Sequence, residues 1–294
     1  MAAAGSVRES GTMRKAFIQA LFTLLLAAPG VHAQDVVRTG DIAARGLKNS
    51  DFPRITKIAD RVYAYEQVDP TKRTVTVNNL IVITSEGVVV ADGQGTVENT
   101  RRLVSDIATL TPLAIRYVIV GSEHGDHRGG DAAFPSSAVF IKEPRTLSMG
   151  DTDIQILNIG RAHTGHDLVT YLPREKILWM SEVFSNRIFP SMANSNPLEW
   201  VETLKKAERM DVRVYLPAHG FIDSPAILRE EERNFRLALE RVIAEGRRLH
   251  DARVPVDEAV GRADFGPYAS WTRRADNADG ALMRIYMDLD GELK

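Results

Sequence analysis

Runs of β-branched residues alternate with amphipathic helices along both halves of the chain, and this pattern restricts the possible folds most strongly. Residues 75–84 and 88–91 are β-branched runs separated by a short polar turn, which is typical of a hairpin. Residues 96–110 repeat large apolar side chains at helical spacing. Because the strands are apolar on both faces, both faces must be buried. The pattern predicts an α/β (α+β) protein folded as a four-layer αββα sandwich.

The order of the remaining elements predicts one domain. No Pro-, Gly- or Ser-rich linker interrupts residues 34–294, and a helical extension is expected from about residue 225. Residues 34–53 have no period and are expected to be a mobile lead-in. Further strands are expected at residues 55–65 (a pair), 117–120, 138–141, 154–159, 168–172, 177–180 and 212–216, and further helices at 197–210 and 278–289.

The first 33 residues have the pattern of an export signal. Met13-Arg14-Lys15 is basic, residues 16–28 are nearly all apolar, and the small residues Val31 and Ala33 precede a cleavage point. The apolar run is shorter than the roughly twenty residues that span a membrane. We expect cleavage after Ala33 and a periplasmic or secreted protein with no membrane span. An uncleaved anchor is the alternative, and translation can start at Met1 or Met13.

Composition excludes several function classes. The formal net charge is −2, so no basic excess is present to hold a nucleic acid. The chain contains no cysteine, which excludes disulfides, thiolate metal sites and a cysteine nucleophile. We therefore expect a small-molecule substrate and no nucleic-acid partner; the sequence carries no signal of oligomeric state.

Five of the seven histidines lie in three glycine-bearing loops that follow predicted strands: His124, His127, His163, His166 and His219. Loops at strand ends are where a rigid scaffold gathers functional side chains. Between positions 124 and 127 the sequence His-x-Asp-His, with Asp126, places three metal donors within four residues. Imidazole and carboxylate without thiolate suit Zn²⁺, iron or manganese. The alternative, histidines scattered over surface and core, does not account for this clustering.

The same residues resemble a known family. Positions 122–127 (Ser-Glu-His-Gly-Asp-His), followed by Gly129-Gly130, are similar to the His-x-His-x-Asp-His motif of the metallo-β-lactamase superfamily. Asp92-Gly93, Ala162-His163-Thr164 and Pro217-Ala218-His219-Gly220 resemble its other conserved loops in order and spacing. The resemblance implies an αββα sandwich with a metal site at one edge between the sheets. It also implies hydrolysis, most often of lactam, thioester, lactone or phosphodiester bonds.

Two residues depart from the family pattern. Ser122 stands where the family has its first histidine, and Glu182 where it has the bridging aspartate. Since a hydroxyl is a poor zinc ligand, the resemblance leaves His124 and His163 at the first metal position. Replacing Ser122 with His is therefore expected to raise the metal stoichiometry. The second position keeps its full set of donors: Asp126, His127 and His219, with Glu182 within reach.

Three further residues have two interpretations each. His166 stands where the family usually has glycine, and is either a substitute metal ligand or an ordinary loop residue. Asp167 and Asp92 are either partners that orient a ligand imidazole or turn residues that accept hydrogen bonds from the backbone. The pocket walls are expected from the loops at 68–73, 184–196 and 221–225.

The resemblance predicts an exported metal-dependent hydrolase of a small ester, thioester, lactone or related substrate. One Zn²⁺ would be held tightly and a second weakly or not at all. Asp126 and Glu182 are the candidate catalytic carboxylates, which orient a metal-activated water or move its proton. The alternatives are a periplasmic β-lactamase with a modified first zinc site, and a non-catalytic, metal-poor binding protein on the same fold.

Overall fold

The computed structural model describes residues 36–293, and the predicted signal segment lies outside them. Two sheets form the centre of the fold. The first has the strand order β1-β2-β3-β4-β5-β6 and the second the order β11-β10-β9-β8-β7. The strands are β1 (Arg54–Ala59), β2 (Val62–Val68), β3 (Thr76–Thr84), β4 (Gly87–Ala91), β5 (Ile115–Ile119), β6 (Val139–Ile141), β7 (Arg145–Met149), β8 (Thr152–Leu157), β9 (Val169–Leu172), β10 (Ile177–Trp179) and β11 (Val214–Leu216).

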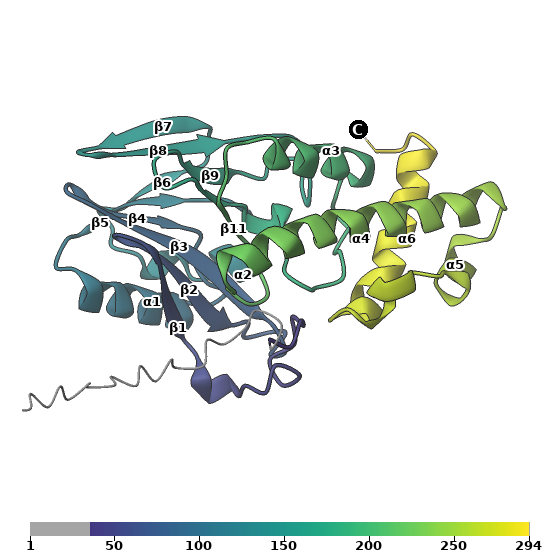
Figure 1. Cartoon of the computed structure of the whole chain (residues 1–294), viewed down its shortest axis with the longest axis horizontal. Helices are drawn as coiled ribbons and strands as arrows, with labels where there is room; N and C mark the ends of the chain where they lie inside the picture. The colour runs from purple at the N-terminus through teal and green to yellow at the C-terminus, as the bar shows by residue number, and fades with distance from the viewer. Residues whose placement is uncertain (1–35, 294) are drawn as a thin grey trace, which may run out of the picture. The chain divides into compact units, whose positions relative to one another are not determined.

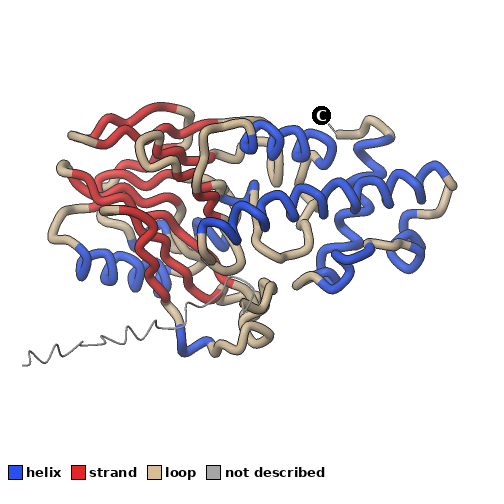
Figure 2. Tube along the Cα trace, viewed as in Figure 1, coloured by secondary structure: helices blue, strands red, loops and turns tan. Residues whose placement is uncertain are grey.

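Helices cover the outer faces of both sheets. They are α1 (Val97–Leu110), the short α2 (Gly125–Arg128), α3 (Pro197–Glu208), α4 (Pro225–Asp251), α5 (Val256–Arg262) and α6 (Arg274–Leu289). Figure 1 shows α1 apart from the group formed by α3, α4, α5 and α6, and Figure 2 shows the strands gathered between them. The predicted four-layer αββα sandwich is confirmed.

The burial of β3 shows why the layers form. All nine of its residues are buried, and successive side chains point to opposite faces. Leu80 and Val82 enter the core between the two sheets, whereas Ile81 and Ile83 pack towards α1 with Leu103 and Ile107. A strand that is apolar on both faces therefore holds the sheet–sheet layer and the sheet–helix layer together.

The structure differs from the sequence prediction at β7, α5 and α6. Strand β7 was not predicted, because Arg145–Met149 is mostly exposed at the edge of the second sheet and contains no apolar run. Helix α6 begins at Arg274 rather than near residue 278, and α5 precedes it without a clear sequence signal. The other predicted strands and helices are confirmed to within a few residues.

The described part of the lead-in, residues 36–53, is attached to the body of the fold, which corrects the expectation of a mobile segment there. Ile42 is buried, Arg38 forms an ion pair with Glu231 of α4, and Arg45 forms one with Asp223. These contacts involve side chains far along the chain, so no local sequence period could reveal them.

Candidate metal centre

The histidine loops meet at one edge of the two sheets because the strands that carry them end there. Strands β4 and β5 are parallel neighbours in the first sheet, and β10 and β11 are parallel neighbours in the second. The loop after β5 leads directly into α2, whose residues Asp126 and His127 follow His124 at its N-terminus. Glu182 lies in a single 3-10 turn after β10, and His219 follows β11.

Asp92, fully buried after β4, connects two of these loops. Its Oδ1 accepts hydrogen bonds from the backbone N–H groups of Gly121 (2.6 Å) and Ser122 (3.2 Å), and its Oδ2 accepts one from the Ser181 hydroxyl (2.9 Å). A Cβ on Gly121 would lie 2.6 Å from the Ser181 oxygen, so glycine is required for this close approach. Asp92 also lies 3.5 Å from Nδ1 of His127. It therefore fixes both loops and faces a candidate metal ligand.

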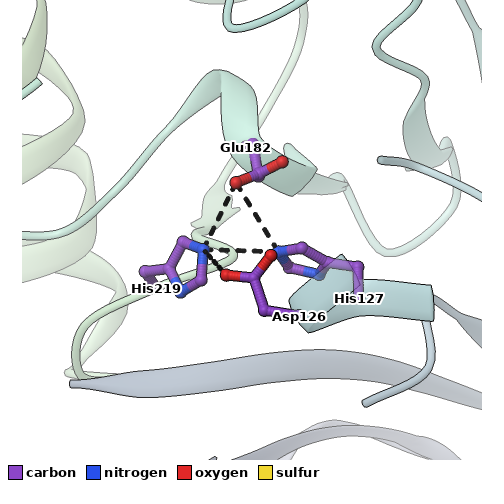
Figure 3. Close-up of side chains that lie close together, drawn as sticks. All are labelled: Asp126, His127, Glu182 and His219. Carbon is purple, nitrogen blue, oxygen red and sulfur yellow. Dashed lines mark hydrogen bonds and ion pairs between the residues drawn. The ribbon is translucent and has the colours of Figure 1, made fainter. Parts of the chain in front are cut away.

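Four donors form the first group, drawn in Figure 3: Asp126, His127, Glu182 and His219. The Nε2 atoms of His127 and His219 lie 3.3 Å apart, and both face Oε1 of Glu182, at 3.8 and 3.4 Å. Oδ2 of Asp126 lies 3.7 Å from His219 Nε2. We call this set the four-donor group.

Three donors form a second group: His124, His163 and, again, Glu182. Nδ1 of His124 lies 2.9 Å from Oε2 of Glu182 and 3.1 Å from Nε2 of His163, which lies 3.2 Å from Oε1. We call this set the three-donor group. The sequence interpretation left only the two histidines at this position. That count is corrected, because Glu182 extends between the two groups and contributes to both.

The four-donor group fits a tetrahedral metal ion. Metal–nitrogen and metal–oxygen bonds of about 2.0–2.2 Å give ligand–ligand edges of roughly 3.3–3.6 Å, close to the separations in the four-donor group. Nδ1 of His219 lies 2.8 Å from the backbone carbonyl of Thr76, which accepts a hydrogen bond from it. That hydrogen bond leaves Nε2 of His219 with a lone pair directed at the group, as a metal ligand requires.

The electrostatics of the carboxylates also suit a metal ion. Burial would raise the pKa of Glu182, but His163, His127 and hydrogen bonds from the histidines outweigh it and hold the pKa well below its usual range. Burial likewise opposes ionisation of Asp126, whereas His219, His127 and Lys72 lower its pKa. Both side chains are therefore anionic at neutral pH, as carboxylate ligands must be.

The structure separates the remaining candidates. Asp167 accepts hydrogen bonds from the backbone N–H (2.8 Å) and the hydroxyl (2.9 Å) of Thr164, so it shapes the loop that carries His163. His166 is exposed and belongs to neither donor group, so the structure does not bring it in as a substitute ligand. Ser122 is buried, and its hydroxyl donates a hydrogen bond to Glu182.

Lys72 is a site residue that no sequence motif indicates. Its ammonium group lies 2.8 Å from Oδ2 of Asp126 and 3.5 Å from Asp69. The loop at 68–73 was expected only to form a pocket wall, and nothing in its local sequence indicates a partner 54 positions away. The contact compensates part of the negative charge of the four-donor group.

Four of the six donors line a cavity of about 120 Å³: His124, His163, Glu182 and His219. For comparison, an engineered cavity of about 150 Å³ holds benzene. The predicted loops at 68–73 and 184–196 contribute Lys72 and residues from Ser185 to Asn194, whereas the loop at 221–225 contributes none. Phe189 and Trp200 line the cavity; Phe184 and Met192 are buried in the core instead.

The Ser122–Glu182 contact changes how the first position should be tested. Ser122 is 2% exposed, so an imidazole at 122 requires space that the longer side chain of Glu182 occupies. We expect Ser122→His alone to destabilise the fold by about 1–3 kcal/mol through overpacking. The double variant Ser122→His/Glu182→Asp is expected to regain stability and to bind more metal per chain than the wild type. Elemental analysis with thermal unfolding checks this, and unchanged metal content in a folded double variant contradicts our assignment of position 122.

Comparison with known proteins finds similarity in sequence and in fold. No protein-family model matches the sequence. The chain is 23% identical over 208 residues to a metallo-β-lactamase type 2 of Bacteroides fragilis, covering 61% of this chain and 84% of that protein. It is 22% identical over 179 residues to a metallo-β-lactamase type 2 of Bacillus sp. (strain 170), covering 51% and 69%.

Among solved structures, a metallo-β-lactamase from Pontibacter korlensis matches with a TM-score of 0.55 and 21% identity, over 63% of this chain and 99% of that one. The chain therefore has the metallo-β-lactamase fold. In both sequence and fold, the chain is therefore similar to metallo-β-lactamases. Within residues 36–293, no helix is both long and apolar enough to cross a membrane.

Proposed function

We propose that this protein is an exported, zinc-dependent hydrolase of a small ester, thioester or lactone. The observation that carries the proposal is the pair of donor groups that share Glu182 and open into one cavity. A zinc ion held by these donors would polarise the bond under attack and activate water for hydrolysis. The four-donor group would hold one ion tightly, and the three-donor group a second ion more weakly.

The chain's own residues perform three tasks in this proposal. Asp126 and Glu182 orient the attacking water through their carboxylate oxygens. Asp92 and the Thr76 carbonyl hold the imidazoles of His127 and His219 in position, so that their nitrogens converge. The Lys72 ammonium group compensates charge at Asp126, and the buried walls around Phe189 and Trp200 limit access of bulk water.

Hydrolysis of β-lactams is the second candidate function. The observation in its favour is that the relatives and the similar solved structure carry the name metallo-β-lactamase. Ser122 and Glu182 give this chain a different donor set at the first position, so we rank the candidate behind ester, thioester and lactone hydrolysis. Fold alone does not fix the substrate.

One purification tests both candidates. We expect the protein, isolated from the periplasm without chelators or a histidine tag, to start at Gln34 and to contain about one zinc or more per chain. It should hydrolyse simple esters, thioesters or lactones, lose that activity on removal of zinc with a chelator, and regain it on adding zinc. A higher turnover of nitrocefin than of the esters, thioesters and lactones would favour the lactamase. No bound metal after equilibration with excess zinc would overturn the proposal and favour a non-catalytic binding protein.

A further inference from the structure

One wall of the cavity comes from the start of α6, far along the chain from the metal donors. Arg273 and Asn277 line the cavity together with Glu182 and three of the histidines. Two hydrogen bonds join this wall to the segment around Phe189. The N–H of Phe189 donates to the carbonyl of Thr272 (2.9 Å), and the side-chain amide of Asn277 donates to the carbonyl of Phe189 (2.7 Å).

Arg273 occupies a left-handed backbone conformation, with φ 63° and ψ 17°. That conformation costs a residue with a Cβ about 1–2 kcal/mol. Three other arginines share it, among them Arg253, whose side chain lies outside this cavity. Strain of this size persists only where surrounding contacts hold it, and here the ties at Thr272 and Asn277 do so.

The charges of the cavity lining do not balance. One lining residue, Glu182, is acidic, and two, Lys72 and Arg273, are basic. Lys72 is engaged by Asp126 at 2.8 Å. Nearby Arg187 is also engaged, since two of its nitrogens contact Glu231 at 2.5 and 2.9 Å.

Arg273 differs from both of these cations. Its one ion pair within the described residues 36–293 is a long contact of 3.5 Å to Asp276, whose side chain is 59% exposed. An exposed, long ion pair contributes little. Arg273 therefore supplies a cation at the cavity, and within the described residues no close carboxylate uses the hydrogen-bonding capacity of its guanidinium group.

We propose that Arg273 binds a carboxylate group of the substrate. The inference rests on the proposed function and narrows its substrate class to small carboxylic acids that carry a hydrolysable acyl bond and an apolar body. The planar guanidinium matches a carboxylate with two parallel hydrogen bonds. Asn194 and Asn277 also line the cavity and carry N–H donors, and Val75, Ile188 and Phe189 supply an apolar surface.

A binding experiment tests the inference without requiring turnover. Phenylacetate and its neutral amide, phenylacetamide, are titrated calorimetrically into the purified protein, both zinc-free and zinc-loaded. We expect phenylacetate to bind more tightly than the amide at either zinc content. Arg273→Gln should weaken phenylacetate binding about 10- to 100-fold and leave phenylacetamide unchanged, as loss of a charged hydrogen-bond pair predicts. Arg273→Lys keeps the positive charge but loses the planar pair of N–H donors. Its affinity for phenylacetate should therefore lie between those of the wild type and Arg273→Gln.

Arg253→Gln is the matched control, because it removes the same side chain from the same backbone conformation outside the cavity. It should bind phenylacetate as the wild type does. Circular dichroism and thermal unfolding confirm that each variant is folded. Equal phenylacetate affinity in folded Arg273→Gln and wild-type protein overturns the inference, and so does a wild type that binds the amide as tightly as the acid.

A kinetic comparison separates this inference from the proposed function. The zinc-loaded protein is assayed with mono-4-nitrophenyl adipate and with its uncharged methyl ester. We expect Arg273→Gln to raise KM about 10- to 100-fold for the acid alone, with kcat changing less. If the wild type hydrolyses neither ester while Arg273→Gln loses phenylacetate binding, the hydrolase proposal fails and the carboxylate site stands. If both esters are hydrolysed and Arg273→Gln changes neither KM, the hydrolase stands and the carboxylate site fails.

Discussion

Glu182→Gln is expected to remain folded and to lose both its metal and its activity. Glu182 is the one residue common to the two donor groups, so its replacement removes an anionic ligand from each. The amide keeps the size of the side chain and can still accept the hydrogen bond from Ser122. Changing residues that merely support metal ligands costs 10- to 100-fold in affinity, so loss of this shared ligand should cost more than about 100-fold.

The corresponding activity loss is expected to reach about 1000-fold in kcat/KM, or roughly 4 kcal/mol of transition-state stabilisation. Elemental analysis and ester hydrolysis on the same preparation measure both effects. The control is His166→Ala, which removes an exposed histidine three positions from the ligand candidate His163 and should change neither quantity. Wild-type metal content in Glu182→Gln would show that the two groups are not joined by this residue.

Glu231 and Glu232 are buried neighbours in α4, and replacing each with Gln is expected to change the stability of the protein in opposite directions. Both are almost fully buried. Glu231 accepts hydrogen bonds from Arg187 and from Arg38, at 2.7 Å for the latter. Glu231→Gln leaves Arg187 without its counter-charge and leaves Arg38 only the exposed Glu230 at 3.3 Å. It should destabilise the protein by about 2–4 kcal/mol, less than the loss of a fully buried pair because the arginines keep some exposure.

Glu232 lacks such partners, and one of its carboxylate oxygens has no hydrogen bond within the described part of the chain. Burial, with the nearby charge of Glu208, raises its pKa from 4.5 to about 8. Because the folded state holds this proton more tightly than the unfolded state, stability falls as the pH rises from about 4.5 to about 8. Glu232→Gln removes that loss and should stabilise the protein by about 2–3 kcal/mol at pH 7.

Denaturant unfolding of both variants at pH 5 and pH 8 measures these changes. The gain from Glu232→Gln should be small at pH 5 and larger at pH 8, and each kcal/mol corresponds to roughly 2–4 °C in Tm. Destabilisation by Glu232→Gln at pH 8 would contradict the assignment of an unpaired buried carboxyl. Stabilisation by Glu231→Gln would contradict the ion-pair role assigned to Glu231.

Much of the fold could be read from local patterns. Strand β3 and helix α1 were predicted almost to the residue, because alternation and helical spacing repeat within a few positions. Strand β7 was not, since an exposed edge strand needs no apolar run. The lead-in was predicted to be mobile because its own sequence has no period. Its attachment depends on a distant partner, since Arg38 pairs with Glu231, which lies 193 positions along the chain.

The candidate site was likewise predictable only in part from the sequence. His124, Asp126 and His127 share one loop and its short helix, so their spacing alone indicated a metal site. Sequence reasoning also singled out Glu182 and Ser122 as departures from the family motif. It could not show that they contact each other, because 60 positions separate them and the contact exists only once the loops after β5 and β10 meet.

The sequence by itself determined the layered αββα architecture and the loops that carry the donors. Apolar periodicity and the residue types at strand ends are local properties of the sequence, so they can be recognised without knowing any tertiary contact. Only the tertiary structure decided that Glu182 joins two donor groups, that Lys72 faces Asp126, and that Arg273 lines the same cavity. Each of these depends on where separate segments come together, and the position of a charge relative to a distant partner is set by the packing of both sheets and their helices.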